Sequence, residues 1–431
     1  MLTLFLLSQY VCLLNNLEKC NICVMRKIGL LTYHSVYNFG ANLQALSTLW
    51  YFKNHGYDIK IINWRPKDLS KNYKKTTSKK QVTMHESFFE RFFDLTDVCY
   101  TDEDIIQVIE SESIDVIVIG SDAVCRHFPF LVRWRPSRSC LFLKNRLYTP
   151  DIYPNPFWGS FYSKLRKKVP MILMSVSSQG TLYKYTIFSE RKKLAKALDN
   201  FSFISVRDHW TQKVFGYFSY EKKMPKITPD PVFGFNMNVP ASLLSKDIIR
   251  RFCLPERYII LSFKQGYLPS RNWVERFVHC CSNQGISVVS LPYPQEENCL
   301  DVDINISLPI NPIEWYNIIK YSIGYVGNNM HPIVVSMHNA VPFFSFDYYG
   351  YLGFFSRKVN LEFSKIYDLL INAGFLEYYV NMQSSSFHFP EPEFVFDKVY
   401  NFDLVRGRYL AKEKEKCYIE LMKSIEEVIN K

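Results

Sequence analysis

The sequence lacks several features that define common protein classes. No run of about eighteen apolar residues occurs, the length that a helix needs to cross a bilayer. The apolar stretch at residues 1–14 is too short for such a span, and it has neither the basic start nor the small-residue cleavage site of a secretory signal. The absence of internal repeats and of low-complexity segments excludes a fibrous repeat and a disordered chain.

The cysteines lack the spacing of a disulfide framework or of a zinc site. The eleven cysteines are scattered along the chain. Cys20 and Cys23 form one Cys-x-x-Cys pair, but no second Cys or His pair lies at zinc-finger distance, so no metal site is predicted. An odd number of scattered cysteines favours a reducing compartment, and we therefore expect a cytoplasmic protein.

What the sequence does contain is typical of a folded protein with two or three domains. Of its 431 residues, 48% are hydrophobic and 22% are charged, close to the average for globular chains. The formal net charge of +11 indicates an anionic partner: nucleic acid, a membrane surface, a phosphorylated small molecule or an acidic polymer. The basic residues are spread out, and no RRM, KH or helix-turn-helix pattern is present, so nucleic acid is not expected.

Short apolar runs alternate with segments of helical period, which predicts an α/β protein with parallel sheets and crossover helices. The first strand series is predicted at Lys27–Tyr33, Asp58–Trp64, Ile114–Gly120, Pro170–Val176 and Phe201–Val206, and the second at Tyr258–Phe263, Gly285–Leu291, Ser322–Val326 and Val341–Phe346. Helices are predicted at Gly40–His55, Ser87–Phe93, His331–Asn339 and Ala411–Ile429, and loops at Pro66–Lys80 and Arg126–Trp158.

The two strand series predict two Rossmann-like domains that face a central cleft. The first domain is expected over residues 26–235 and the second over 236–350, followed by a C-terminal extension, 351–431, that ends in a helix. Met25 begins the segment that leads into the first strand and resembles a natural translation start. We therefore expect residues 1–25 to be an N-terminal extension outside the fold.

In open α/β sheets, ligands bind outside the carboxyl ends of the strands, so the residues after each strand are the candidate site. Asn38 and Gly40 lie in the turn into the first helix, where free N–H groups favour a phosphate or a carboxylate, although helix capping explains them equally well. Ser121 and Asp122 follow the third strand, with an Asx turn as the alternative interpretation.

Two further strand ends carry residues suited to binding an anion. Arg207 could hold a phosphate through two N–H groups, or it could form a salt bridge with a neighbour such as Asp208. Asn329 lies in a small polar turn after a strand, and His331 lies in the first turn of the apolar helix that follows, where the helix N-terminus lowers the pKa of a histidine. A lone histidine in such a place is more often structural than catalytic.

Taken together, these segments resemble the polysaccharide pyruvyltransferase family, in order and spacing, across about residues 26–350. The resemblance is carried by KIGLLTYH with NFGANLQA, YDIKIINWRP, DVIVIGSD, ISVRD, Asp230-Pro231, and His331 with the VPFFSF strand after it. It implies a GT-B-like fold and the transfer of pyruvate from phosphoenolpyruvate, as co-substrate and without another cofactor, to a sugar of a cell-surface glycan or its lipid-linked precursor. The usual product is a cyclic ketal.

The resemblance also implies roles for the candidate residues. His331 would protonate the methylene carbon of the donor, Arg207 would hold its phosphate or carboxylate, and Asp122 would orient the acceptor. Asn38, Gly40, Ser121, Asn329 and Lys264 are the expected donor-binding residues. Many family members have Arg where this chain has Asn329, so one anion contact is missing, and Lys264 or Arg126 is the candidate substitute.

Two other functions fit the same sequence. A GT-B glycosyltransferase that uses a nucleotide sugar would share the architecture and the cleft. A catalytically inactive scaffold in glycan synthesis would use its basic surface to bind an anionic lipid or polymer. We also expect peripheral association with the inner face of the membrane, because the net positive charge suits an anionic, membrane-proximal acceptor.

Overall fold

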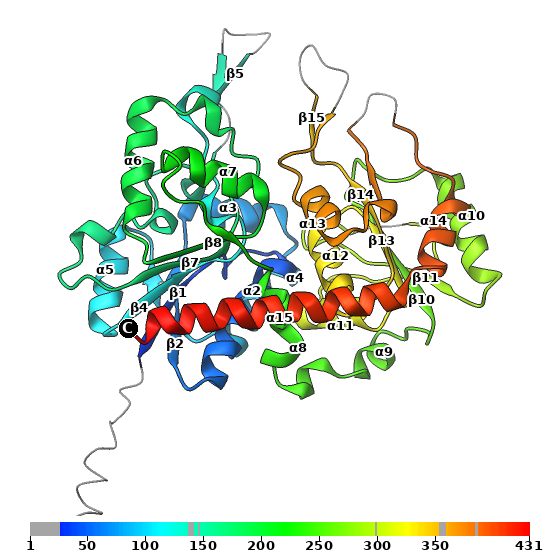
Figure 1. Cartoon of the computed structure of the whole chain (residues 1–431). Helices are drawn as coiled ribbons and strands as arrows, with labels where there is room; N and C mark the ends of the chain where they lie inside the picture. The colour runs from blue at the N-terminus through cyan, green and yellow to red at the C-terminus, as the bar shows by residue number, and fades with distance from the viewer. Residues whose placement is uncertain (1–25, 137–141, 145–146, 298–299, 353–358, 384–386) are drawn as a thin grey trace, which may run out of the picture.

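The computed structural model describes residues 26–431 except 137–141, 145–146, 298–299, 353–358 and 384–386. The predicted N-terminal extension, residues 1–25, therefore lies outside the described residues. Two parallel sheets form the centres of two halves that stand side by side (Figure 1). Their central strands, such as Val116–Ile119, are buried along their whole length, which explains their continuous apolar runs.

The first sheet has seven parallel strands in the order β3-β2-β1-β4-β7-β8-β9. Their bounds are β1 Lys27–Leu31, β2 Asp58–Trp64, β3 Leu95–Cys99, β4 Val116–Ile119, β7 Met171–Val176, β8 Phe203–Val206 and β9 Lys226–Ile227. The predicted strands of the first series are confirmed to within a few residues. The edge strand β3 was not predicted, because its burial does not alternate and only two of its five residues are buried.

The second sheet has six parallel strands in the order β12-β11-β10-β13-β14-β17. Their bounds are β10 Tyr258–Ser262, β11 Ser287–Ser290, β12 Ile304–Asn305, β13 Gly324–Gly327, β14 Phe343–Asp347 and β17 Tyr379–Asn381. The two sheets confirm the predicted α/β architecture of two Rossmann-like units. Strand β17 pairs with β14, so the second sheet continues into the segment from residue 351 on that the sequence analysis separated as an extension.

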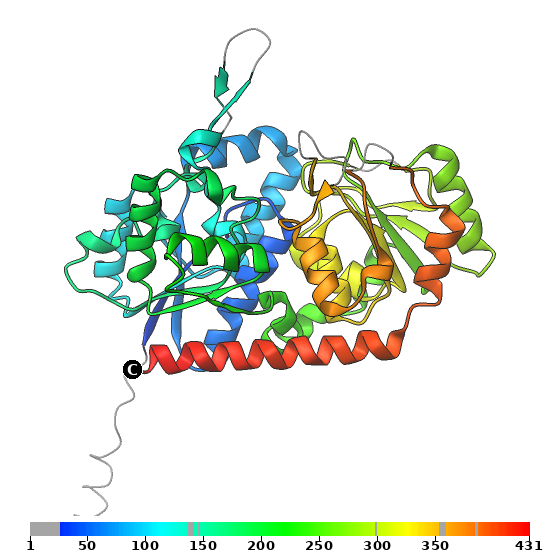
Figure 2. The same cartoon turned by 45° about the horizontal axis from the view of Figure 1, so that its top comes forward.

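Helices connect the strands and pack on the sheets (Figure 2). The longer ones are α2 Phe39–Asn54, α3 Lys67–Thr76, α4 Lys79–Phe92, α5 Asp102–Ser111, α6 Phe188–Asp199, α7 His209–Phe218, α10 Arg271–Ser282, α11 Pro312–Lys320, α12 Met330–His338, α13 Lys365–Ala373, α14 Pro392–Tyr400 and α15 Leu404–Ile429, with short α8 Phe235–Asn238 and α9 Asp247–Arg251. Helix α5 begins with a capping box, Thr101 and Asp104, a signal that the prediction overlooked.

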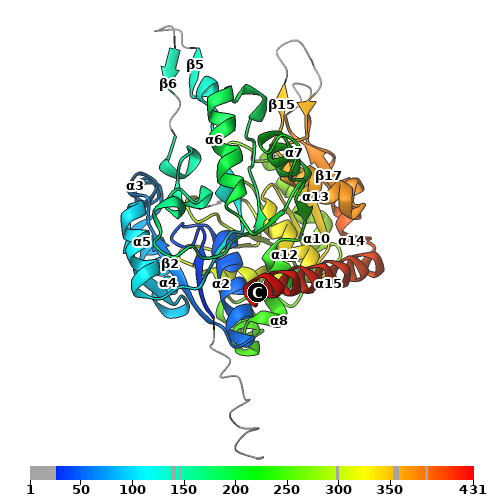
Figure 3. The ribbon, with the colours of Figure 1, turned by 60° about the vertical axis from the view of Figure 1, so that its left-hand side comes forward.

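Two predicted loops are partly ordered into regular structure. The basic segment Pro66–Lys80 contains helix α3, and the prediction of a loop there was wrong. Only Leu69 and Tyr73 are apolar in this helix, so the segment is polar enough to resemble a solvated loop. The lysines in its last turn interact favourably with the negative end of the helix dipole. The segment Arg126–Trp158 contains short 3-10 turns and a hairpin, β5 Trp134–Pro136 with β6 Phe142–Lys144, which projects from the first half (Figure 3). A second two-stranded hairpin, β15 Tyr351–Leu352 with β16 Val359–Asn360, follows β14.

Helix α15 runs beneath both halves and joins their cores (Figures 1 and 2). The ring of Tyr418 is fully buried against Gly234, where an added Cβ would lie 2.1 Å from it. The Tyr418 hydroxyl accepts a hydrogen bond of 2.8 Å from Asn238, and Tyr51 of α2 donates one of 3.2 Å to Glu426 near the end of α15. The helix therefore extends the core of the second half underneath the first.

Loss of the Tyr418 ring should destabilise the whole protein. Tyr418→Ala removes a fully buried aromatic side chain, and we expect it to lower the free energy of unfolding by about 3–5 kcal/mol in urea titrations. Tyr409→Ala on the same helix is the control, because Tyr409 is 72% exposed and its loss should change stability by less than about 0.5 kcal/mol. Equal effects of the two substitutions would contradict the placement of α15.

Candidate functional site

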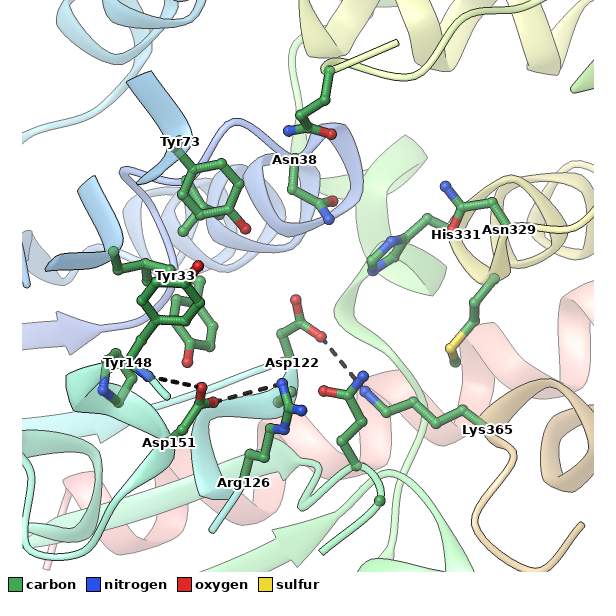
Figure 4. Close-up of a pocket in the computed structure, with 18 of the residues that line it drawn as sticks. Tyr33, Asn38, Tyr73, Asp122, Arg126, Tyr148, Asp151, Asn329, His331 and Lys365 are labelled. Carbon is green, nitrogen blue, oxygen red and sulfur yellow. Dashed lines mark hydrogen bonds and ion pairs between the residues drawn. The ribbon is translucent and has the colours of Figure 1, made fainter. Parts of the chain in front are cut away.

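A pocket of about 700 Å³ lies between the two halves, at the carboxyl ends of strands from both sheets. Its walls come from the loops after β1, β4 and β8 of the first half and after β10 and β13 of the second. The predicted residues that it brings together are His331, Arg207, Asp122, Asn38, Asn329 and Lys264. Figure 4 shows Asp122 lying between Arg126 and Lys365, with His331 facing it from the second half.

Gly40 supports the pocket from below and does not line it. It lies in the first turn of α2, and a Cβ there would come within 2.0 Å of the His331 ring. Only glycine permits this contact, because the helix starts of α2 and α12 meet at that point. The Asn38 side chain caps α2 by accepting a hydrogen bond of 3.2 Å from the amide of Ala41. Both predicted residues of this turn therefore position the site.

Ser121 is not among the residues that line the pocket. Its side chain is buried, and its hydroxyl donates a hydrogen bond of 3.0 Å to the carbonyl of Ser175 in the neighbouring strand β7. Its part in donor binding stays a prediction. Asp122, one residue further on, turns into the pocket with a φ of 75°, a left-handed conformation that non-glycine residues rarely adopt.

Arg207 lies at the centre of a buried charge network. Its guanidinium donates a hydrogen bond of 2.5 Å to Asp230 and one of 3.3 Å to Asp122, and the side chain is only 4% exposed. The side-chain amide of Gln44, on α2, donates a hydrogen bond of 2.6 Å to the same oxygen of Asp230. A buried cation needs such carboxylates, since an unpaired charge away from water is costly. The salt bridge that the sequence analysis gave as one alternative for Arg207 is present, with Asp230 and Asp122 as its partners and Asp208 instead capping α7.

Asp122 is held in the ionised form. Burial alone would raise its pKa, but the charges of Lys365 and Arg207 outweigh burial and lower the pKa to about 2. The Lys365 amine lies 3.8 Å from the Asp122 carboxylate. At neutral pH the pocket therefore presents a carboxylate that accepts hydrogen bonds and cannot donate one.

Lys365 is a functional candidate that the sequence analysis missed. It is the first residue of α13 and only 13% exposed. Burial, and next the charge of Arg207, lower its pKa to about 8, although Asp122 opposes the shift. No local motif marks Lys365, because it reaches the pocket from a helix far along the chain. Arg126 forms an ion pair of 3.6 Å with Asp151 and adds another cation to the pocket. Arg126 and Lys264, the two predicted substitutes for the missing anion contact at Asn329, both line the pocket.

His331 is buried with one ring nitrogen unused. Its Nε2 has no hydrogen-bond partner among the residues that the structure describes, and neither does Nε of Arg207. Burial lowers the pKa of His331, against the raising effect of Asp122 and Asp230. Burial therefore favours the neutral imidazole, and an anion bound beside it would raise the pKa of His331 again.

The arrangement suits a small, strongly anionic molecule together with a sugar. Arg207, Lys365, Arg126 and Lys264 supply positive charge, and His331 can exchange a proton. Tyrosines on the walls offer the flat surfaces on which sugars pack: Tyr33, Tyr73, Tyr148 and Tyr349. No group of three or more His, Cys, Asp or Glu side chains that could hold a metal ion is found in the described part of the chain.

The sequence matches one protein family, and the fold resembles several solved structures. A model of the polysaccharide pyruvyl transferase family matches residues 38–350. The UDP-GlcNAc 2-epimerase from Neisseria meningitidis, solved with UDP-GlcNAc bound, has a TM-score of 0.52 at 10% identity over 93% of this chain and 100% of its own. At that identity the likeness shows the fold alone, which is GT-B.

Two other solved structures resemble this chain with lower TM-scores. The UDP-N-acetylglucosamine 2-epimerase from Rickettsia bellii has a TM-score of 0.48 at 9% identity, over 94% of this chain and 97% of its own. A spinosyn forosaminyltransferase has a TM-score of 0.46 at 9% identity, over 94% of this chain and 100% of its own. The search of curated proteins finds no match.

The lowered pKa of Lys365 predicts a measurable pH dependence of stability. Between its folded value of about 8 and its ordinary value of 10.5, the unfolded chain binds more protons than the folded one, so raising the pH stabilises the fold. Relative to Lys365→Met, the wild type should gain about 3 kcal/mol of unfolding free energy between about pH 7 and pH 10.5. Urea titrations across this range measure it. A constant difference would show that the amine is not buried as described.

Proposed function

Because the chain belongs to the polysaccharide pyruvyl transferase family, a family of transferases, we propose that it transfers pyruvate from phosphoenolpyruvate to a sugar of a cell-surface glycan or its precursor, as a ketal. The observation that carries the proposal is the buried His331, with a free ring nitrogen, beside Arg207 and Lys365 in one pocket. Phosphoenolpyruvate has a phosphate and a carboxylate, so its site needs at least two cationic positions, and Arg207 and Lys365 are the two nearest to Asp122 and His331 that we assign to it. Lys365 takes the place of the anion contact missing at Asn329.

The reaction would begin with binding of the donor and a proton. The negative charge of phosphoenolpyruvate raises the pKa of His331, so the imidazole becomes protonated in the complex. His331 then gives this proton to the methylene carbon of the donor, and the central carbon becomes electrophilic. Arg207 and Lys365 hold the phosphate and the carboxylate while the charge shifts.

The acceptor would then complete the transfer. One sugar hydroxyl attacks the central carbon, a second hydroxyl closes the ring, and inorganic phosphate leaves as the bond to the bridging oxygen breaks. Of the two hydroxyl protons released, one restores His331 and the other leaves with the phosphate. The ionised Asp122 accepts a hydrogen bond from an acceptor hydroxyl and so orients it. Phosphoenolpyruvate is a co-substrate in this scheme, and no other cofactor takes part.

Substitution of His331 tests the proposal. Phosphate release from phosphoenolpyruvate, measured with a panel of sugar acceptors, should fall by about 100-fold or more in His331→Ala. His279→Ala is the matched control, since His279 is exposed on α10 outside the pocket, and it should retain full activity. Full activity of His331→Ala would remove the proton transfer assigned to His331.

Ligand binding separates the proposal from its two alternatives. Phosphoenolpyruvate should raise the melting temperature of the wild type. Stabilisation by a nucleotide sugar and not by phosphoenolpyruvate would identify a glycosyltransferase. Stabilisation by neither ligand would favour a non-catalytic scaffold.

We further propose that the protein works in the cytoplasm, at the inner face of the membrane. In the described part of the chain, no helix could cross a bilayer. The six cysteines that the structure describes are all free, which suits a reducing compartment. A surface of the first half exposes large apolar side chains: Phe130, Leu131, Trp134, Tyr185 and Phe188.

The two segments that carry these apolar side chains are held together, and exposed lysines lie near them in the sequence. The Glu190 carboxylate, on the segment with Phe188, accepts a hydrogen bond of 3.1 Å from the backbone amide of Phe130. It accepts another, of 2.7 Å, from the guanidinium of Arg133. The exposed lysines are Lys184, Lys192 and Lys193. Apolar side chains among lysines are typical of proteins that bind anionic lipid surfaces.

Vesicle binding tests the membrane proposal. The protein should sediment with phosphatidylglycerol vesicles and much less with phosphatidylcholine vesicles, because the lysines need anionic lipid. Phe188→Ser should weaken the binding, whereas Tyr409→Ser, an equally exposed aromatic position on α15, should not. Equal binding by both variants would exclude this surface as the contact.

A further inference from the structure

A second cavity, of about 300 Å³, lies beside the main pocket, at the carboxyl end of β2 and along helix α3. We call it the basic cleft, after the cations that line it: Arg65, Lys67, Lys71 and Lys74. Glu86 is the one acidic side chain among its lining residues. The function proposed above makes no use of this cleft.

Most of the positive charge in the basic cleft is uncompensated. Lys74 forms an ion pair of 3.1 Å with Glu86. The Arg65 guanidinium donates a hydrogen bond of 2.8 Å to the neutral side-chain amide of Asn63. The Lys67 amine lies 4.7 Å from the centre of the Tyr100 ring. Within the described ranges, no carboxylate pairs with Arg65, Lys67 or Lys71. Three free cations around one hollow attract an oligoanion.

The basic cleft adjoins the main pocket through helix α3. One face of the helix, with Leu69 and Asn72, lines the main pocket, whereas Lys67 and Lys71 line the cleft. Tyr73 belongs to the walls of both. A ligand that lies across Tyr73 can therefore place one end in each cavity.

A third cavity, of only about 10 Å³, lies between the other two. It shares Ser35 and Ser70 with the basic cleft, and Tyr33 and Leu69 with the main pocket. No residue of helix α3 is fully buried, but Tyr73 packs partly on the core beside Tyr37, so a ligand that reaches both cavities has to pass over the Tyr73 ring.

We propose that the basic cleft binds the phosphate or diphosphate of a phosphorylated sugar acceptor and thereby directs its sugar into the main pocket. This inference rests on the proposed function, in which Arg207 and Lys365 are already occupied by the anionic groups of the donor. A separate group of free cations then calls for a second anion. An arginine among lysines, at a strand end, is the donor set that phosphate oxygens prefer. Diphosphates linked to a lipid or to a nucleoside share this chemistry.

Binding of inorganic pyrophosphate to the whole protein, measured by calorimetry at low salt, tests the basic cleft. Lys67→Gln/Lys71→Gln should weaken pyrophosphate binding by about tenfold or more. Lys75→Gln/Lys79→Gln removes the same charge from exposed lysines that do not line the cleft, and should weaken it less than about twofold. Equal losses in the two double variants would overturn the proposal, because general charge would then explain the binding.

Phosphoenolpyruvate serves as the second probe, so that failure of the cleft and failure of the proposed function can be distinguished. Lys67→Gln/Lys71→Gln should bind phosphoenolpyruvate as the wild type does, and saturating phosphoenolpyruvate should leave pyrophosphate binding in place. Displacement of pyrophosphate by phosphoenolpyruvate would place both in the main pocket and overturn the proposal. Cleft-dependent pyrophosphate binding without any phosphoenolpyruvate binding would keep the anion site and refute the assigned donor.

Two larger probes identify the source of the diphosphate. Farnesyl diphosphate and UDP should both compete with pyrophosphate and lose affinity in Lys67→Gln/Lys71→Gln. Tighter binding of farnesyl diphosphate indicates a lipid-linked acceptor, and tighter binding of UDP indicates a nucleotide-linked one. Failure of both to compete would overturn the assignment to an acceptor phosphate.

Discussion

The contact between Gly40 and the His331 ring is the constraint on which the rest of the site depends. It joins the starts of α2 and α12, one from each half, at a distance that no side chain on Gly40 would allow. Helix α2 is buried on nearly every side, and a helix in that position fixes whatever its side chains touch. Through Gln44 it holds Asp230, and through Asp230 it holds Arg207. One helix thus sets the imidazole and the guanidinium relative to each other.

The charges of the pocket are balanced before any ligand arrives. Asp122 and Asp230 offset Arg207 and Lys365, so neither cation is buried alone. An anionic ligand must therefore compete with fixed carboxylates for the same N–H groups, which favours ligands with several negative oxygens over singly charged ones. The basic cleft differs in this respect, since Arg65, Lys67 and Lys71 form no ion pair with a carboxylate in the described part of the chain.

The sequence predicts the parts of this protein that local pattern determines. The central strands follow from apolar runs, and the residues after them, from Asn38 to His331, follow from the rule that ligands bind at the carboxyl ends of parallel strands. Lys365 could not be found that way, because only the tertiary fold brings α13 to Asp122. Helix α3 was missed because its sequence is almost entirely polar. The burial of the Ser121 side chain was not foreseen, because sequence does not reveal which way a side chain turns after a strand.

Helix α15 also bears on how the chain is made. The first half contains a complete sheet by Ile227, yet Tyr418 and its neighbours on α15 fill the space beneath Gly234 and α2. During synthesis, which proceeds from the N-terminus, that apolar underside stays open until about two hundred further residues have emerged. The first half therefore completes its buried underside only with the last helix of the chain, after the second half has been synthesised.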